Sequence, residues 1–385
     1  MGNDGALERW GWDRNWAQEA IEAGGDCGSA TGAAAADGPA AFIHPARRLS
    51  ARVVRHSHHH YEVVAAPEGE RVATTVSGAF SYRAAGPADY PTVGDWVLLD
   101  GGSGRIEVVL RRRTAISRST AGDESLEQVI AANIDVLFLV FGLDGGRNYT
   151  TGMLERSLVA ARGSGVRPVV VLNKCDCADD STIEKVESEV RRSAPDLSVH
   201  VVSAVNDAGI DALLGEASPG ETIGMLGKSG VGKSALVNAC LRSANCATEP
   251  AARTGAQRSD GKGRHTTSDK QFYLLPSGAI IADVPGLREL KLWGDVHTLD
   301  SAFPDIEELA AECRFSDCRH NGEPDCRVRE ALATGELSLD RFSRYLDYLR
   351  ELAFLERRRD QRALLEERKK RKQIAQHSRR FRKGG

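Results

Sequence analysis

The order of two short motifs constrains this chain more than any other feature of its sequence. Residues 227–234 read Gly-Lys-Ser-Gly-Val-Gly-Lys-Ser, the full pattern of a phosphate-binding loop. Residues 173–176 read Asn-Lys-Cys-Asp, a tetrapeptide of the kind that recognises a purine base, and they come before the phosphate loop. Any fold for this chain must bring the two motifs together although they occur in the reverse of their usual order.

The glycine-rich loop has the flanking pattern that phosphate binding requires. It follows a predicted strand at 222–226 and opens a predicted helix at 233–241. Its backbone N–H groups would point at phosphate oxygens, and the helix dipole would add to the attraction. We expect Lys233 to contact the β- and γ-phosphates and Ser234 to bind Mg²⁺. The predicted nucleotide-binding residues of this segment are Gly227, Lys228, Ser229, Gly230, Val231, Gly232, Lys233, Ser234 and Ala235.

The Asn-Lys-Cys-Asp tetrapeptide, which is Asn173, Lys174, Cys175 and Asp176, follows a predicted strand at 168–172. The Asp176 carboxylate would accept two hydrogen bonds from guanine, from N1–H and from the exocyclic amine. Adenine has no N1 donor and would leave the charge unpaired, which costs several kcal/mol. The stem of Lys174 would pack along the base plane. Because Ser203 and Ala204 follow the next predicted strand and complete the set, we predict a site for GTP.

Two further segments have the composition of parts that sense the γ-phosphate. Residues 261–267 read Gly-Lys-Gly-Arg-His-Thr-Thr within a long polar stretch, and either Thr266 or Thr267 would bind Mg²⁺. The pattern does not choose between the two threonines. Asp283 ends a predicted strand at 279–282 and would reach Mg²⁺ through water. The Gly286 N–H would reach the γ-phosphate.

The residue after Gly286 is Leu287, whose side chain neither donates nor accepts a hydrogen bond. Many GTPases have a glutamine here that orients the attacking water, so we expect slow intrinsic hydrolysis. We hypothesise that His265 positions the water instead. The alternative is that His265 is a loop histidine that faces solvent.

A cysteine group near the C-terminus has the spacing of a metal site. Cys313, Cys318, His320 and Cys326 supply three thiolates and one imidazole within fourteen residues. Such a set suits one tetrahedral zinc ion, and a complete set of four ligands leaves no open position, so the zinc would be structural.

The pattern of apolar residues divides the chain into predicted domains. Five short β-branched runs lie between about residues 49 and 113 and predict a small barrel of the OB type, although an SH3-like barrel would have the same pattern. Strands alternate with helices from about residue 128, which predicts a mostly parallel sheet with helices on both faces. A single amphipathic helix is predicted at 7–22. The predicted organisation is a multidomain α/β chain: helix and flexible linker at 1–48, barrel at 49–113, permuted GTPase domain at 114–292, helical zinc-binding domain at 293–355 and basic tail at 356–385.

The charge of the chain is unevenly distributed. The net charge is −3, yet residues 356–385 contain thirteen Lys or Arg and four Asp or Glu. A basic tail on an acidic body suggests a polyanionic partner, or else a solvated surface tail.

No apolar run is long enough to span a bilayer, and the first residues lack the pattern of a signal peptide. We therefore expect a cytoplasmic protein with no membrane partner, and we expect a monomer.

The order of the motifs along the chain is that of a circularly permuted GTPase. The tetrapeptide at 173–176, which we call the base reader, comes first, followed by the phosphate loop at 227–234 and then by the two segments, 261–267 and 283–286, that would sense the γ-phosphate. Together with the preceding small barrel, the Gly-Arg-His-Thr-Thr and Asp-Val-Pro-Gly segments, and the Cys-x4-Cys-x-His-x5-Cys cluster, this order resembles the RsgA/YjeQ family. The likeness covers nearly the whole chain. It implies a GTPase that acts late in assembly of the bacterial small ribosomal subunit, binds its rRNA and hydrolyses GTP faster when bound to it. By the same resemblance Asn173, Lys174 and Asp176 read guanine, the cysteine cluster holds zinc, and His265 matches a family histidine implicated in hydrolysis.

Two other functions fit parts of the sequence. One is a GTP-dependent regulatory switch whose partner is a protein. The other is a nucleotide-dependent metabolic enzyme, which would need a second substrate pocket, and no further nucleophile or paired-carboxylate pattern is visible for it. The sequence does not indicate the stage of subunit assembly, the rRNA elements contacted, the role of the Gly/Ala-rich linker or whether the protein is essential.

Overall fold

A computed structural model describes residues 5–24, 48–57, 60–66, 69–120, 123–145, 148–245, 270–284, 299 and 302–357. His265, Thr266, Thr267, Gly286, Leu287 and the basic tail from residue 358 lie outside these ranges. The chain forms two compact units. The first contains Met1–Arg118 and Gln128–Leu290, and the second contains Ser119–Glu127 and Lys291–Gly385.

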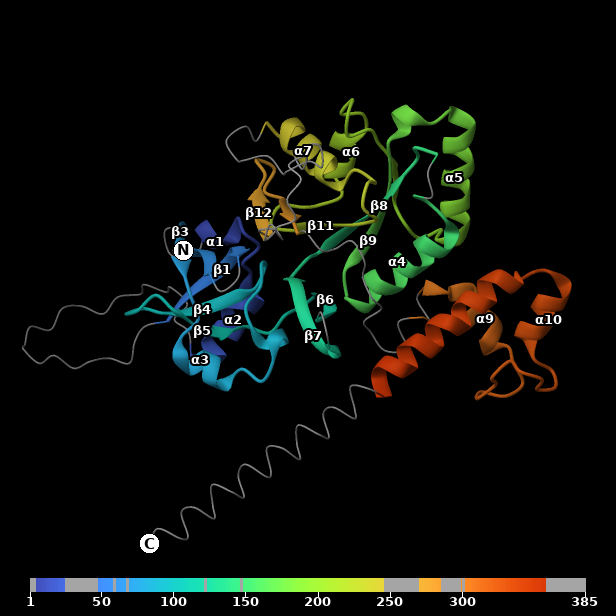
Figure 1. Ribbon diagram of the computed structural model, residues 1–385, viewed down its shortest axis with the longest axis horizontal. Coiled ribbons are helices and arrows are strands. Elements are labelled where there is room, and N and C mark those ends of the chain that lie inside the picture. The colour runs from blue at the N-terminus through green and yellow to red at the C-terminus, as the bar shows by residue number, and fades with distance from the viewer. Residues whose placement is uncertain are drawn as a thin grey trace, which may run out of the picture. The chain divides into compact units, whose positions relative to one another are not determined.

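Within the described residues, the first unit is built on one mixed sheet of eleven strands (Figure 1). Five neighbouring strands are parallel and run in the order β10 (Val199–Val201), β9 (Arg167–Asn173), β8 (Val136–Gly142), β11 (Thr222–Leu226) and β13 (Ile280–Asp283). Their predominantly apolar sequences fit strands that are covered on both faces. The sequence-based prediction of a parallel α/β sheet is therefore confirmed.

The helices between these strands supply the rest of the core. They are α4 (Thr151–Gly163), α5 (Asp180–Ser193), α6 (Ile210–Leu214) and α7 (Lys233–Ser243). Leu236 and Val237 of α7 and Ile210 of α6 share a buried cluster with Val136 and Phe138 of β8. Because side chains alternate along a strand, this places α6 and α7 on the face of the sheet to which those two β8 residues point.

A second group of strands, which we call the β1–β5 ring, precedes the α/β sheet in the chain. β1 (Arg48–Ser57) pairs with β2 (His60–Ala65) and β4 (Trp96–Asp100), β2 pairs with β3 (Glu70–Thr74), and β4 pairs with β5 (Ile106–Val109). A parallel bridge between Val76 and Ile106 brings the chain after β3 beside β5. Between β3 and β4 lie the short helices α3 (Gly78–Arg83) and η1 (Pro87–Asp89). Buried side chains from four of the strands fill its interior: Ala51, Val53, Tyr61, Val63, Val97, Leu99 and Ile106.

The ring and the α/β sheet are continuous. β12 (Lys270–Leu274) pairs antiparallel with β13 on one side and with β1 on the other, where Arg55 faces Gln271 and His56 faces Lys270. The sequence pattern did not predict this connection, because strand pairing between distant segments leaves no local signal. The hairpin of β6 (Ala115–Thr120) and β7 (Asp123–Ala132) forms a separate two-stranded sheet and was also not predicted.

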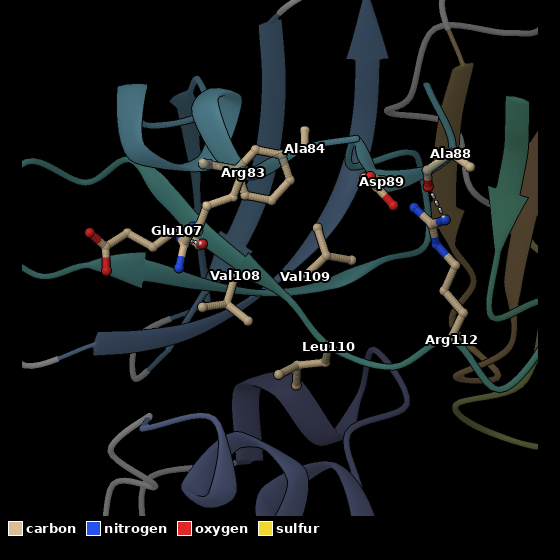
Figure 2. A pocket seen from close by; sticks show the side chains of 10 residues that line it. Arg83, Ala84, Ala88, Asp89, Glu107, Val108, Val109, Leu110 and Arg112 are labelled. Carbon is tan, nitrogen blue, oxygen red and sulfur yellow. Dashed lines mark hydrogen bonds between the residues drawn. The ribbon is translucent and has the colours of Figure 1, made fainter. Parts of the chain in front are cut away.

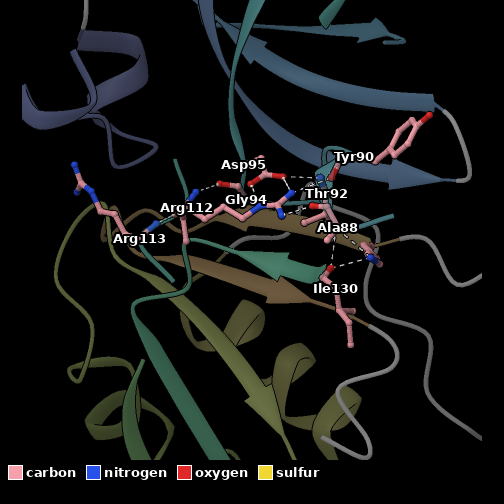
Figure 3. Close-up of polar contacts among 10 residues, drawn as sticks. Ala88, Tyr90, Thr92, Gly94, Asp95, Arg112, Arg113 and Ile130 are labelled. Atoms are coloured by element: carbon pink, nitrogen blue, oxygen red, sulfur yellow. Dashed lines mark hydrogen bonds and ion pairs between the residues drawn. The ribbon is translucent and has the colours of Figure 1, made fainter. Parts of the chain in front are cut away.

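A buried polar network connects the ring to β7 and β12 (Figure 3). Arg112 donates from Nε to Asp95 Oδ1 and from Nη2 to Asp95 Oδ2, each at 2.7 Å, and Asp95 is fully buried. The Thr92 hydroxyl donates to the Ile130 carbonyl at 2.9 Å. Lys270 Nζ donates to the same carbonyl at 2.8 Å and to the Thr92 hydroxyl oxygen at 3.1 Å. The network fixes the turn before β4 against the first residue of β12.

The prediction of one continuous N-terminal helix is wrong, because the chain forms α1 (Gly5–Glu8) and α2 (Arg14–Glu22). Gly11 between them has φ +87°, and a Cβ there would lie 2.5 Å from the Gly220 carbonyl oxygen. Asp13 then begins α2 by accepting hydrogen bonds from the N–H groups of Asn15 and Trp16. This turn buries the Trp12 and Trp16 side chains beside Trp96 of β4.

The described residues 302–357 of the second unit are mainly helical. They contain α9 (Pro304–Ala311), α10 (Arg327–Thr334) and a helix at 339–357. Arg341 holds Asp305 through two hydrogen bonds of 2.6 Å, and Phe303 packs against Tyr345 and Tyr348. These contacts fix α9 against the last described helix.

Candidate functional site

The phosphate-binding loop lies between β11 and α7, at the carboxyl end of the parallel strands. Gly227 packs directly on β8, since a Cβ there would lie 2.3 Å from the Val140 carbonyl oxygen. Gly230 and Gly232 have φ values of +91° and +96°, a backbone conformation that residues other than glycine rarely adopt. Lys233 Nζ donates to the carbonyls of Gly227 and Lys228 across the loop. Thus the lysine is already turned over the loop, where phosphate groups would lie.

Asn173 joins three segments of the site. Its side chain is buried, donates from Nδ2 to the Val231 carbonyl at 2.8 Å, and accepts from the Ala204 N–H at 3.2 Å. A Cβ on Gly232 would lie 2.4 Å from Asn173 Nδ2. Both ends of this amide are therefore engaged by backbone groups, so Asn173 holds the base reader, the phosphate loop and the 203–204 turn together.

Asp176 occupies the exposed position that a base-reading carboxylate needs. Its Oδ1 accepts a hydrogen bond of 2.5 Å from the Ser203 hydroxyl. This hydrogen bond holds the pKa of Asp176 below its usual value, so the side chain is ionised near neutral pH. Ser203 thereby orients the carboxylate without covering it. The neighbouring Cys175 is half-buried, and its N–H donates to the Val202 carbonyl.

Four residues that the sequence reasoning missed support the site: Asp144, Asn148, Asp207 and Arg242. Asp144, which follows β8, contacts Lys174 and Asn148, and Arg242 at the end of α7 donates to the Ala204 carbonyl at 3.0 Å. Arg242 also pairs with Asp207 at 2.6 Å, which fixes the 203–207 turn against the helix of the phosphate loop. Asp144 could have been found from sequence, because it stands just after a predicted parallel strand, where ligand-binding residues occur.

The four predicted zinc ligands come together in the second unit. The ligand atoms of Cys313, Cys318, His320 and Cys326 all lie within 4.8 Å of one another. Sγ of Cys313 is 3.9 Å from Sγ of Cys326, and these two sulfurs are 3.7 and 3.4 Å from His320 Nδ1. A tetrahedron with zinc–sulfur bonds of about 2.3 Å and a zinc–nitrogen bond of about 2.0 Å has sulfur–sulfur edges of about 3.8 Å and sulfur–nitrogen edges of about 3.5 Å. The donor set and its spacing therefore fit zinc.

Comparison with known proteins gives one consistent result. The family model described as RsgA GTPase matches residues 109–293. A protein of Opitutus terrae named small ribosomal subunit biogenesis GTPase RsgA is 42% identical over 325 residues, which cover 81% of this chain and 86% of that protein.

The chain belongs to the RsgA GTPase family.

Solved structures agree with this membership. The crystal structure of YjeQ from Thermotoga maritima is 28% identical, has a TM-score of 0.58, and covers 80% of this chain and 99% of that chain. A structure described as YloQ, a circularly permuted GTPase, has a TM-score of 0.56 at 21% identity, with coverage of 82% and 98%, and supports the fold alone. As an RsgA GTPase the chain is a GTP hydrolase with a permuted α/β fold, as the sequence indicated.

Two of the residues predicted to serve magnesium in this RsgA GTPase, Ser234 and Asp283, lie within the described residues. Ser234 lies in the first turn of α7 and Asp283 ends β13, beside β11. Burial raises the pKa of the Asp283 carboxyl, and a divalent cation at this edge of the sheet would favour its charged form. Hydroxyl and carboxylate oxygens are the ligands that Mg²⁺ prefers, so the described residues fit the ion.

A surface hollow of about 510 Å³ lies on the β1–β5 ring, and none of its lining residues belongs to a nucleotide motif (Figure 2). It is lined by Phe80, Arg83, Ala84, Ala88, Asp89, Glu107, Val108, Val109, Leu110 and Arg112. Arg83 donates a hydrogen bond to the Glu107 carbonyl, and Arg112 donates one to the Ala88 carbonyl.

Among the described residues of this family member, no helix is both long and apolar enough to cross a membrane.

Proposed function

We propose that this GTPase assists late maturation of the small ribosomal subunit and turns over GTP faster when it is bound to that subunit. The observation that carries the proposal is the meeting of Asn173, Asp176 and the 227–234 loop at one edge of the sheet. The name of the Opitutus terrae relative, which covers most of this chain, supports the choice of partner.

Within this site, Asp176 recognises guanine with Ser203 and Ala204 beside it, and Lys174 packs along the base. Lys233 and the backbone of the phosphate loop hold the phosphates, and Ser234, Asp283 and one of Thr266 or Thr267 serve Mg²⁺. The Gly286 N–H contacts the γ-phosphate. His265 positions the attacking water, since Leu287 offers no hydrogen bond. The geometry of the 227–234 loop supports the roles of the described residues, and the motif pattern alone supports those of His265, Thr266, Thr267 and Gly286.

The β1–β5 ring is proposed to be an OB-type barrel that contacts rRNA. Its antiparallel pairings β1–β2–β3 and β1–β4–β5, the Val76–Ile106 bridge and the helix between β3 and β4 support this assignment over an SH3-like barrel. The basic tail would add phosphate contacts. The zinc ion would be structural, because Cys313, Cys318, His320 and Cys326 together complete its four positions.

The first test is GTP hydrolysis by the full-length protein, alone and with purified small ribosomal subunits, with large subunits and ATP as controls. Slow basal turnover that rises many-fold only with small subunits and GTP supports the proposal. A rate that neither subunit changes would contradict it, and would favour a GTP-dependent switch that acts on a protein partner.

Four companion measurements test the finer assignments. His265→Ala is expected to lower the stimulated rate by at least about a hundredfold, whereas Glu184→Ala, on an exposed position of α5, should leave it unchanged. Binding to small subunits should weaken steeply with added salt, because contacts to RNA phosphates release counterions. Light scattering of the purified protein tests the proposed monomer, and fractionation of the source cells tests the proposed cytoplasmic location.

A further inference from the structure

Strand pairing brings the segment after β8 alongside the base reader. In the parallel β8–β9 register, Gly142 lies beside Asn173. The Leu143 N–H donates to the Asn173 carbonyl at 2.9 Å, which continues the pairing one residue beyond the strand. Consequently Asp144 and Lys174, thirty residues apart in sequence, are adjacent at the nucleotide edge of the sheet.

Lys174 is held at both ends. Its backbone is in the left-handed region with φ +67°, a conformation that costs a non-glycine residue about 1 kcal/mol or more. Its Nζ donates to Asp144 Oδ2 at 2.5 Å. The side chain passes the phosphate loop on the way, since a Cβ on Gly232 would lie 3.9 Å from Lys174 Cε. The stem proposed to cover the base therefore has a fixed position between the two loops.

Asp144 is itself fixed. Its Oδ1 accepts a hydrogen bond of 2.7 Å from Asn148 Nδ2. The hydrogen bonds from Lys174 and Asn148 hold the pKa of Asp144 below its usual value, so the carboxylate stays charged near neutral pH. A Cβ on Gly142 would approach Asp144 Oδ1 to 3.2 Å and Asn148 Cβ to 3.3 Å, so the glycine permits this close packing.

The Asp144–Lys174 pair is better placed to hold a side chain than a surface ion pair. The two side chains are 25% and 26% exposed, whereas Asp207 and Arg242 of the neighbouring pair are 45% and 52% exposed. A free lysine loses about 2 kcal/mol of rotamer entropy when it is immobilised. If the ion pair immobilises Lys174 before a nucleotide arrives, that loss no longer opposes binding.

We propose that Asp144, supported by Asn148, is a positioning residue for guanine nucleotides: it fixes the Lys174 stem in the place where the base lies. The inference rests on the proposed function of residues 173–176 as the base reader. Asp144 acts through Lys174 and belongs to none of the nucleotide motifs. Its effect is on affinity for both GTP and GDP, because the base and its surroundings are common to the two.

The test compares Asp144→Asn with the parent in full-length protein, using the affinity for a fluorescent GDP analogue and the KM and kcat of GTP hydrolysis. We expect Kd and KM to rise about tenfold, with kcat at saturating GTP within about twofold of the parent. Asp180→Asn, which removes an exposed carboxylate in the first turn of α5, should leave Kd and KM unchanged. Thermal melting of each variant without nucleotide separates loss of affinity from loss of folding.

A double-mutant cycle decides whether Asp144 acts through Lys174. In a Lys174→Met background, Asp144→Asn should have little further effect on Kd. An undiminished effect in that background would overturn the proposal, as would an Asp144→Asn variant with the parent's affinity. If the parent itself failed to bind guanine nucleotides, the proposed function would fall and this inference with it, so the two failures are distinguishable.

Discussion

Arg52, in β1 of the ring, donates a hydrogen bond of 2.9 Å to the hydroxyl of Thr222, the first residue of the strand that leads into the phosphate loop. The guanidinium also donates to the carbonyls of Trp10 and Asn133 and lies over the Trp96 and Phe272 rings. Burial lowers the pKa of Arg52 to about 10, although Asp135 and Asp95 favour its charged form. One charged side chain thus joins the N-terminal segment, the ring and the α/β sheet.

Arg52→Ala should strongly destabilise the first unit, because it leaves two carbonyls and a hydroxyl without their donor and opens a cavity. We expect a loss of about 3–5 kcal/mol in the free energy of unfolding, measured by urea denaturation. The control is Arg71→Ala, whose partner Glu62 lies in an exposed pair and whose loss should cost below about 1 kcal/mol. If the two variants lost equal amounts of unfolding free energy, the buried contacts of Arg52 would contribute no more to stability than an exposed ion pair does.

Gly227→Ala should impair nucleotide binding for a steric reason. The new Cβ would lie 2.3 Å from the Val140 carbonyl oxygen, which belongs to the backbone of β8 and has little freedom to move. We expect Kd for GDP to rise at least about thirtyfold, measured by isothermal titration. Gly86→Ala is the control, since a Cβ there meets no atom within 4 Å. Wild-type affinity in Gly227→Ala would mean that the loop is less tightly packed on β8 than described.

Sequence patterns predicted the α/β core and the zinc ligands because each rests on local information. The strand predicted at 222–226 agrees with β11, and the Cys-x4-Cys-x-His-x5-Cys spacing brings its ligands together within one short loop. The β1–β12 pairing and the Asp144–Lys174 contact join segments far apart in the chain, so no local pattern encodes them. The break of the N-terminal helix at Gly11 depends on the Gly220 carbonyl, about two hundred residues away.

Lys270→Met should stabilise the protein at neutral pH. Burial lowers the pKa of Lys270 to about 8, with Arg118 and Arg112 acting in the same direction and Asp95 against it. Below pH 8 the folded state bears a buried charge, at a cost of up to about 3 kcal/mol relative to the unfolded chain. Between pH 8 and about 10.5 the unfolded state binds more protons, so this group makes the parent more stable as pH rises.

The measurement for Lys270 is urea denaturation at pH 7, 9 and 10. The stability of Lys270→Met relative to the parent should be highest at pH 7 and should decline as pH rises through this range. Lys185→Met, at an exposed position of α5, provides a control whose difference from the parent stays constant. A Lys270→Met variant less stable than the parent at pH 7 would show that its hydrogen bonds to Thr92 and Ile130 outweigh the burial of charge.

Cys318→Ser should remove zinc from the second unit. Three remaining ligands would hold the ion far more weakly, so zinc measured by atomic absorption should fall from about one atom per chain to near zero. The same variant should lose helical circular dichroism at a lower temperature than the parent. Cys177→Ser, at an exposed cysteine next to the base reader, should keep the zinc content unchanged. If the parent protein could be prepared without zinc and melted at the same temperature as the zinc-loaded protein, the ion would not have a structural role.

The continuous sheet gives the ring and the α/β core a connection that depends little on side-chain identity. β1 and β12 are joined at Arg55–Gln271 and His56–Lys270 by main-chain hydrogen bonds, which every residue except proline can make in full. Most substitutions at these four positions would leave this backbone pairing intact, although the Lys270 side chain also donates to Thr92 and Ile130. If a large partner bound to the ring and displaced it, the displacement would therefore be transmitted to β12 through the paired backbones of β1 and β12.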